Sequence, residues 1–213
     1  MDRGIVPVRS VVLSVYDKSG VEELARGLRE YSRDLAMYAT GGTFRALEKL
    51  FPGTAAVQQV SDYTGQPELE GGLVKTLDYK LYLGLLADPD RKEHAGDMER
   101  VGARPIDLVV VNLYPFGKAS AESPGDLMKA RDFIDIGGPT MLRAAAKSFY
   151  RVAALCDPAD YPALLTELRE HGGTSAETRF RLAQKVFAYT ADYDAAIRDH
   201  LAGFLPGGDE THG

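Results

Sequence analysis

Four short segments combine glycine, threonine, aspartate and lysine in a way that could hold an anion and move a proton. They are DKSG (17–20), ATGGT (39–43), VKTLDYK (74–80) and NLYPF (112–116). Glycines let a backbone approach a ligand closely, and free amides at a following helix start could bind a phosphate together with the Thr40 and Thr43 hydroxyls. Such an anion gains about 0.3 to 1 kcal/mol from the helix dipole. Taken alone, TGGT is more typical of a tight strand-to-helix turn and Lys18 of a surface lysine.

The segment IDIGGPTMLRAAAK (134–147) is the richest in groups that could do chemistry. Pro139 suits a first helical turn, and Asp135 stands just ahead of the unpaired amides of that turn. Lys147 lies roughly 10 Å along the helix axis from Thr140, so its long side chain could still reach back toward a ligand. A helix cap at Asp135 and a favourable cation near the helix C-terminus at Lys147 explain the segment equally well.

Tyr114 and Asn112 follow the most apolar strand candidate. A tyrosine in that place is more often a core aromatic whose hydroxyl finds a partner, and the asparagine could stabilise a turn. What favours function is the combination: a phosphate cradle, two lysines, an aspartate, an amide and a phenol on loops of one sheet edge.

The elements that must position these loops alternate between strand and helix. The predicted strands cover 10–15, 35–39, 55–60, 106–114 and 151–156, with helices over 21–31, 44–50 and 140–149. This alternation predicts an α/β fold with a doubly wound, mostly parallel sheet and helices on both faces, and ligands in such sheets sit beyond the carboxyl ends of the strands. Two further helices, 161–171 and 175–201, have no strand between them, and 206–213 read as a frayed tail.

Composition sets limits on the partners. The 213 residues suit one domain, and 25 Lys plus Arg against 31 Asp plus Glu give a net charge of −6, so no general basic field would attract nucleic acid. The lone Cys156 forms no internal disulfide, and the absence of a signal-peptide core or a membrane-length apolar run favours the cytoplasm. The four histidines lack ligand spacing, so we expect no metal.

The motifs LSVYDKSG, ATGGT, VSDYTGQPE, VKTL, PIDLVVVNLYPF, IDIGGPTMLRAAAK and FAYTADYDAAI occur in this order between about Arg9 and Leu201. Together they resemble the inosine monophosphate (IMP) cyclohydrolase domain, the N-terminal half of the bifunctional family that also carries aminoimidazole carboxamide ribonucleotide formyltransferase activity. The resemblance implies a methylglyoxal-synthase-like fold, a free-standing domain over 1–213 with a core over 9–201, and an absent formyltransferase domain. It also implies closure of 5-formamidoimidazole-4-carboxamide ribonucleotide (FAICAR) to IMP and water, without cofactor or metal.

The resemblance also implies which residues serve the reaction. We expect Lys75 and Lys147 to orient the reacting groups and stabilise the developing oxyanion, while Asp135, with Tyr114, manages the protons. The matching phosphate-binding positions are Lys18, Thr40, Gly41, Gly42, Thr43 and Thr76, and the positions near the base are Asn112, Ile136 and Gly137.

This chain departs from the family pattern on the phosphate side. The family's usual arginine, histidine and proline around the catalytic lysine are Leu73, Asp78 and Tyr79, and the serine before TGGT is Ala39. A lost charge-assisted contact of about 1.5 to 3 kcal/mol should weaken nucleotide binding unless another cation replaces the arginine. Lys80 and Arg45 are the candidates for that replacement.

Two other functions remain open. The altered loop would suit a cyclohydrolase acting on a related imidazole or pyrazole carboxamide nucleotide, and relatives of this fold also serve as non-catalytic nucleotide-binding or regulatory modules. Lys75, Asp135 and Lys147 argue against the second alternative, because binding alone would not require all three. The resemblance further implies a homodimer and a separate formyltransferase that supplies the substrate.

Overall fold

The computed structural model describes residues 3–52, 54–67, 74–121 and 125–204. Its centre is a five-stranded, all-parallel sheet of order β3-β2-β1-β4-β5. All five predicted strands are present, and four of them are shorter than predicted because the ends of the apolar runs lie outside the hydrogen-bonded ladders. The strands are β1 (Ser10–Val15), β2 (Ala36–Ala39), β3 (Val57–Gln59), β4 (Leu108–Asn112) and β5 (Ala153–Leu155).

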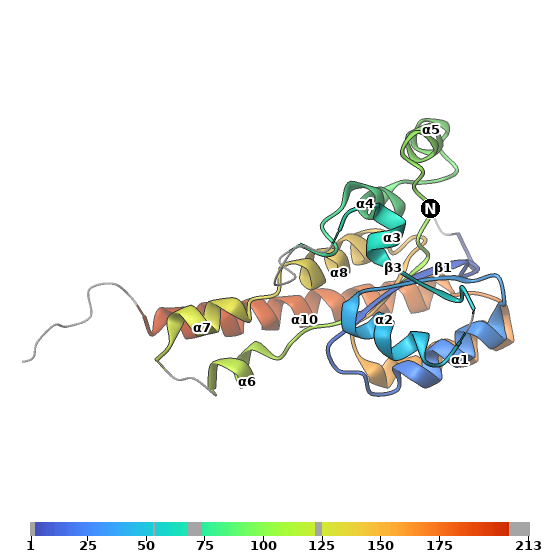
Figure 1. Cartoon of the computed structure of the whole chain (residues 1–213). Helices are drawn as coiled ribbons and strands as arrows, with labels where there is room; N and C mark the ends of the chain where they lie inside the picture. The colour runs from blue at the N-terminus through green and yellow to red at the C-terminus, as the bar shows by residue number, and fades with distance from the viewer. Residues whose placement is uncertain (1–2, 53, 68–73, 122–124, 205–213) are drawn as a thin grey trace, which may run out of the picture.

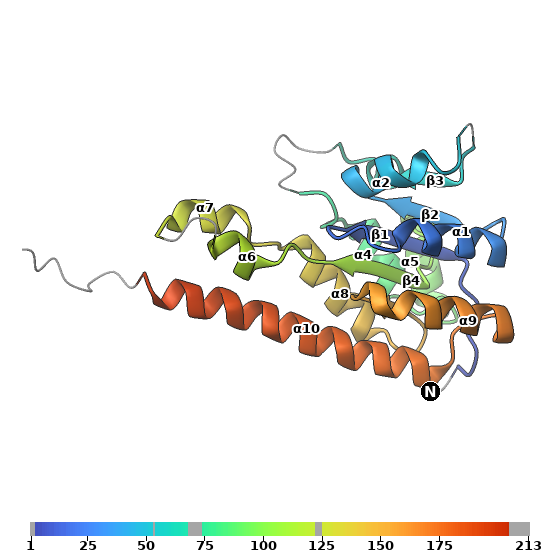
Figure 2. The same ribbon diagram turned by 90° about the horizontal axis from the view of Figure 1, so that it is seen from below.

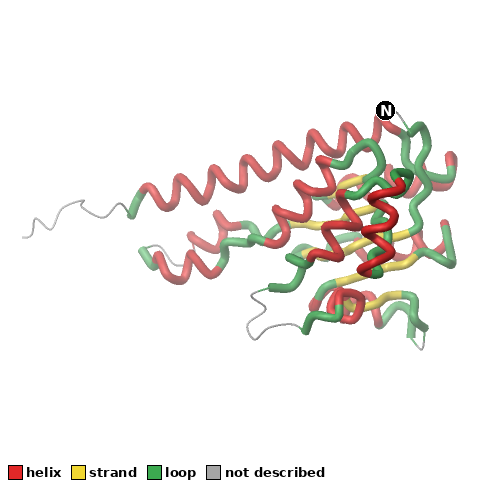
Figure 3. The backbone as a smooth tube through the Cα atoms, turned by 90° about the horizontal axis from the view of Figure 1, so that it is seen from above, coloured by secondary structure: helices red, strands yellow, loops and turns green. Residues whose placement is uncertain are grey.

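Helices cover both faces of the sheet, which confirms the doubly wound α/β fold (Figure 3). Alternate strand residues point to opposite faces, so Val11 and Leu13 of β1 join one buried cluster and Val12 joins the other. One face packs against α1 (Val21–Tyr31), α2 (Gly41–Glu48) and α9 (Tyr161–His171), and the other against α3 (Val60–Thr64), α4 (Tyr79–Leu86), α8 (Gly137–Lys147) and α10 (Ala176–Ala202).

The strand order reverses between β1 and β4. From β1 the chain adds β2 and β3 on one side, then returns to place β4 and β5 on the other. This reversal is the topological switch point at which open α/β sheets bind ligands. The chain between β3 and β4 includes α3, α4 and α5 (Lys92–Val101), none of which the sequence analysis identified.

Helix α4 follows the Lys75 loop and is held at both ends. At its start the Asp78 carboxylate accepts hydrogen bonds from the amides of Lys80 (2.8 Å) and Leu81 (3.2 Å). At its end the buried Arg151 guanidinium donates to the carbonyls of Leu85 (2.8 Å) and Ala87 (3.0 Å). Arg151 donates hydrogen bonds to carbonyls that the helix leaves unpaired. Helix α4 is therefore held in place, and the loop that precedes it is attached to a fixed helix.

Helices α6 (Phe116–Ala121), α7 (Leu127–Asp132) and the C-terminal part of α10 extend beyond the sheet (Figures 1 and 2). The two predicted C-terminal helices are present, separated by a bend at 172–175, and a 3-10 turn at Pro158–Asp160 precedes α9. The predicted frayed tail, 206–213, lies outside the described residues. None of the described helices is long and apolar enough to cross a membrane.

Candidate active site

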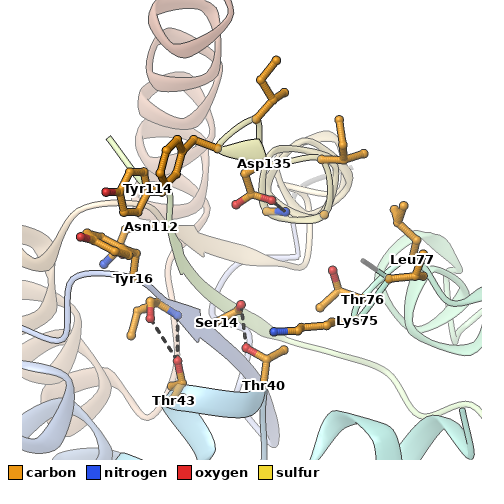
Figure 4. Close-up of a pocket in the computed structure, with 18 of the residues that line it drawn as sticks. Ser14, Tyr16, Thr40, Thr43, Lys75, Thr76, Leu77, Asn112, Tyr114 and Asp135 are labelled. Atoms are coloured by element: carbon orange, nitrogen blue, oxygen red, sulfur yellow. Dashed lines mark hydrogen bonds between the residues drawn. The ribbon is translucent and has the colours of Figure 1, made fainter. Parts of the chain in front are cut away.

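A cavity of about 520 Å³ lies beyond the carboxyl ends of β1 and β4, at the switch point. This volume is within the usual range for a small-molecule site. Five segments line the cavity: the loop after β1, the start of α2, the loop before α4, the loop after β4 and the loop before α8 (Figure 4). The sequence predicted that four of these segments would meet because each follows a strand. That reason is wrong for the loop before α4, which follows α3, and the loop before α8 follows α7.

The start of α2 forms one wall of the cavity. The Thr43 hydroxyl accepts from the Val15 amide (3.0 Å) and donates to the Val15 carbonyl (3.2 Å), while the Thr40 hydroxyl donates to Ser14 Oγ (2.8 Å). Helix α2 begins at Gly41, three residues earlier than predicted, so both glycines of TGGT belong to its first turn. The Thr43 amide donates to the Thr40 carbonyl at 2.8 Å. The Gly41 and Gly42 amides, at the first two positions of the helix, are the ones that suit an anion.

Two cations lie beside this helix start. Lys18 Nζ and Arg45 Nη2 would each be 3.8 Å from a Cβ atom built on Gly42. Lys18 Nζ also donates to the carbonyls of Val15 (3.2 Å) and Tyr16 (3.4 Å), which hold the side chain against the end of β1. Positive charge and helix amides thus gather at one end of the cavity.

The loop before α4 contributes Lys75 and Thr76. The Lys75 side chain is exposed, and Figure 4 shows it directed into the cavity toward Ser14 and Thr40. Thr76 is buried, and a Cβ atom on Gly137 would lie 2.5 Å from its hydroxyl oxygen. The loop before α4 therefore approaches the start of α8 so closely that a side chain at Gly137 would force Thr76 to shift.

Asp135 lies on the loop before α8. One oxygen of its carboxylate accepts from the Gly138 amide (2.9 Å), which is the capping interaction considered from the sequence. A Cβ atom on Gly138 would meet the other oxygen at 2.5 Å. The carboxylate lines the cavity at the same time, so capping and exposure to a ligand coexist.

Aromatic rings and an amide form the wall between these loops. Tyr114 stacks on Phe133 with ring centroids 5.0 Å apart and meets the edge of Tyr16 at 4.3 Å. The Asn112 amide group exchanges two hydrogen bonds of 2.8 Å with the Asp17 main chain, so it stabilises the turn after β1. Ser14, Tyr16 and Phe133 also line the cavity and were not predicted, although each lies within two residues of a predicted position or of an identified motif.

The cavity contains most of the predicted site residues. Those that line it are Lys18, Thr40, Gly42, Thr43, Lys75, Thr76, Asn112, Tyr114, Asp135, Ile136 and Gly137. Gly41, the first residue of α2, is buried and does not line the cavity. Lys147 is exposed at the last turn of α8 and does not line the cavity.

The departures from the family pattern have structural roles of their own. Asp78 caps α4, Ala39 is fully buried, and Tyr79 is exposed. Lys80 Nζ donates to the Tyr63 carbonyl at 2.7 Å and lies 4.5 Å from the centre of the Tyr63 ring. It is therefore engaged away from the cavity. Leu73 lies outside the described residues.

Two titratable groups near the cavity have shifted pKa values. Hydrogen bonds from Ser19 lower the pKa of Asp17, and Lys118 and Lys18 add to that effect. Burial raises the pKa of Tyr82 to about 12, and the charge of Asp135 adds to the increase. Tyr82 is thus a neutral phenol at physiological pH. Within the described ranges, no three His, Cys, Asp or Glu side chains gather into a potential metal site.

Cations and helix amides at one end, with a carboxylate, a lysine and stacked aromatic rings nearby, are typical of an α/β domain that binds a small anionic molecule containing a ring. Comparison with known proteins agrees with this class. The MGS-like domain model matches residues 20–140, and the model described as AICARFT/IMPCHase bienzyme matches residues 145–211. The chain belongs to the MGS-like domain family and is similar in sequence to PurH proteins.

Individual relatives support this placement. The chain is 48% identical over 205 residues to the bifunctional purine biosynthesis protein PurH of Acidithiobacillus ferrooxidans, covering 96% of this chain and 38% of the relative. It is 46% identical over 194 residues to PurH of Nostoc punctiforme, covering 91% and 37%. A crystal structure titled ForH superposes with a TM-score of 0.77 at 36% identity, covering 91% of this chain and 99% of that one. The chain thus spans less than two-fifths of its PurH relatives and nearly all of ForH.

Proposed function

We propose that this chain is an IMP cyclohydrolase that closes FAICAR to IMP and water. The observation that carries the proposal is the joining of Lys75 and Asp135 in one cavity with the cation-flanked start of α2. The match to the AICARFT/IMPCHase model and to PurH relatives supports the same activity. A non-catalytic module would need the anion site but not the carboxylate and the lysine beside it.

The charges of the cavity suggest how the substrate is oriented. The 5′-phosphate would bind the amides of the first turn of α2 with Lys18 and the Thr40 hydroxyl, where both the helix dipole and the cation favour an anion. The planar imidazole would then lie toward Tyr114 and Phe133, whose stacked rings suit a flat partner. This orientation brings the carboxamide and formamide groups toward Asp135. Lys75, which is directed toward Ser14 and Thr40, would turn from that end of the cavity to reach the formyl oxygen.

Ring closure forms one carbon–nitrogen bond and releases one water. The carboxamide nitrogen attacks the formyl carbon, and one proton moves from that nitrogen to the formyl oxygen to give a cyclic carbinolamine. Loss of the hydroxyl group with the proton of the formamide nitrogen then leaves the aromatic ring of IMP. Lys75 would stabilise the negative charge that develops on the formyl oxygen. Asp135 would accept the carboxamide proton and deliver it to that oxygen, and would then accept the formamide proton and deliver it to the hydroxyl group, which leaves as water.

The test is a steady-state assay with FAICAR, in which ring closure changes the ultraviolet absorbance. Asp135→Asn should lower kcat by roughly 10²- to 10⁴-fold, and Lys75→Met by about 10²- to 10³-fold. The exposed Asp192 and Lys49 provide the matched controls Asp192→Asn and Lys49→Met, which should retain wild-type turnover. Full activity in a folded Asp135→Asn variant would overturn the proposal.

The role of Lys147 remains a prediction from the resemblance. Its place at the end of α8, outside the cavity, fits the alternative in which it stabilises the helix C-terminus. Lys147→Ala, compared with Arg143→Ala on the same exposed side of α8, separates the two roles. A loss of kcat specific to Lys147→Ala would support catalysis, and equal turnover in both variants would leave Lys147 a helix-stabilising residue.

Because the loop around Lys75 departs from the family pattern, a related carboxamide nucleotide is the second candidate substrate. The supporting observation is that Lys80, one of the two candidate replacements for the family's arginine, is engaged by Tyr63, which leaves Arg45 as the only candidate. A protein that binds FAICAR without closing it, but closes a pyrazole analogue, would favour this candidate.

A further inference from the structure

The motif FAYTADYDAAI (187–197) contributes no group to the proposed reaction, yet two of its tyrosines contact the loops of the cavity. The Tyr189 hydroxyl accepts a hydrogen bond from the Leu113 amide at 3.0 Å. The Tyr193 hydroxyl accepts from the Asp135 amide at 2.8 Å and donates to the Phe133 carbonyl at 3.3 Å. Four residues apart on α10, the two phenols lie on one side of the helix.

Each hydroxyl contacts the main chain at or beside a residue that lines the cavity. Leu113 lies between Asn112 and Tyr114, and the amide that Tyr193 accepts from belongs to Asp135 itself. An amide in a partly buried loop needs an acceptor, because leaving it unpaired costs free energy. The two tyrosines meet this need and thereby restrict where the loops can lie.

The tyrosines are themselves well anchored. Tyr193 is 8% exposed, and its ring meets the edge of Phe116 at a centroid distance of 6.5 Å. Helix α10 packs against α8 and β5, so its position is fixed by the core. Burial raises the pKa of both phenols, which keeps them protonated at neutral pH. Tyr193 must be protonated to donate to the Phe133 carbonyl while it accepts from Asp135.

We infer that Tyr189 and Tyr193 are positioning residues that fix the loop carrying Tyr114 and the loop carrying Asp135 relative to each other. The two loops already contact each other where Tyr114 stacks on Phe133. The hydrogen bonds of Tyr189 and Tyr193 tie both loops to α10 as well. The consequence for turnover rests on the proposed function. The restraint on the loops does not depend on the proposed function, and amide hydrogen exchange measures it separately.

Tyr189→Phe, Tyr193→Phe and the double variant test this inference, because each change removes only a hydroxyl. The matched control is Tyr31→Phe. The Tyr31 hydroxyl likewise accepts from an amide, that of Val8 (3.3 Å), and donates to the Gly172 carbonyl (2.9 Å), away from the cavity. Two readouts are needed: kcat and KM with FAICAR, and amide hydrogen exchange at Leu113 and Asp135 by NMR.

We expect the double variant to lose roughly 10- to 100-fold in kcat, because small displacements of reacting groups are costly. KM should change less than about threefold, since the phosphate end of the cavity is untouched. Exchange at Leu113 and Asp135 should accelerate at least about tenfold in the double variant and stay unchanged in Tyr31→Phe.

The outcomes separate this inference from the proposed function. If Asp135→Asn abolishes turnover but the double tyrosine variant keeps kcat within twofold of wild type, the inference is overturned and the proposed function stands. If the wild-type protein does not close FAICAR at all, the proposed function fails, and amide exchange decides alone. Faster exchange at both amides then supports the positioning role, and unchanged exchange overturns it.

Discussion

The Thr76 hydroxyl oxygen lies 2.5 Å from the point that a Cβ atom on Gly137 would occupy. Thr76 is next to Lys75 in the loop before α4, and Gly137 is two residues from Asp135 in the loop before α8. The segment that carries Lys75 and the segment that carries Asp135 therefore approach closely at this point, and a side chain at Gly137 would force Thr76 to shift. Such close approach is a recognised use of glycine.

Gly137→Ala should impair both stability and turnover. The added methyl group forces the Thr76 loop outward, and overpacking of this kind typically costs about 1 to 3 kcal/mol. Because the displaced loop carries Lys75, kcat with FAICAR should fall by at least roughly tenfold. Steady-state kinetics and thermal unfolding measure the two effects on the same variant.

Gly96→Ala is the matched control for that substitution. Gly96 lies within α5, and a Cβ atom there would meet nothing within 4 Å. The change should stabilise the protein by about 0.5 to 1 kcal/mol, since alanine favours a helix interior, and should leave kcat unchanged. If Gly137→Ala showed wild-type kcat, the loop contact would have no part in setting the site.

We expect Arg45 to be the cation that replaces the family's arginine, which is Leu73 in this chain. Its guanidinium lies beside Gly42 at the start of α2, together with Lys18. Arg45→Gln should raise KM by roughly fivefold, equivalent to about 1 kcal/mol, because the side chain is exposed and its interaction with phosphate is screened. Steady-state kinetics at low and high salt should show a larger effect at low salt.

Lys80→Gln is the control that separates the two candidate cations. Since Lys80 donates to the Tyr63 carbonyl, its loss should lower the unfolding midpoint and leave KM unchanged. A rise in KM for Lys80→Gln, with none for Arg45→Gln, would reverse the assignment. Leu73→Arg should in turn lower KM if the altered loop only weakens phosphate binding.

Asp78 can be assigned a structural role by a single substitution. Its carboxylate accepts from two amides at the start of α4, so Asp78→Ala should cost about 1 kcal/mol of stability, the usual effect of losing a helix cap. Asp78→Asn should restore most of the loss, because asparagine also caps helices. A change in substrate preference in either variant would instead indicate that Asp78 contacts the substrate.

The general fold and the place of the site could be predicted because each depends on local patterns. Short apolar runs separated by helical periods define a parallel sheet, and the loops after its strands must share one edge. Helix α4 was missed because its sequence, YKLYLGLL, is nearly all apolar and lacks a helical period. Its start is marked by the local cap at Asp78, and its end is bound by Arg151, which is 64 residues beyond Ala87 in the sequence.

Most residues expected at the site line one cavity, but the geometry of that cavity could not be predicted from the sequence. Sequence could not place Lys147 relative to the cavity, because a helix position alone does not say which way α8 faces. Nor could it choose between Lys80 and Arg45, since that choice depends on a hydrogen bond to the Tyr63 carbonyl. The supporting roles of Tyr189 and Tyr193 likewise depend on where a long helix passes two loops.

The ion pair between Asp157 and Lys185 should make stability depend on acid pH. The Lys185 ammonium donates to the Asp157 carboxylate at 2.7 Å. This hydrogen bond is the main cause that lowers the pKa of Asp157 below its usual value, and a hydrogen bond from the Ala159 amide adds to it. Because the folded-state pKa is the lower one, the pair stabilises the fold above the unfolded-state pKa of about 4 and loses this effect as the pH falls through the folded value.

Lys185→Gln should therefore lower the unfolding midpoint at pH 7, and the difference from wild type should shrink toward zero near about pH 2. Lys49→Gln, at an exposed lysine without a described ion pair, should match wild type at every pH. A difference that persists unchanged at low pH would mean that Lys185 acts through packing of its aliphatic chain and not through its charge.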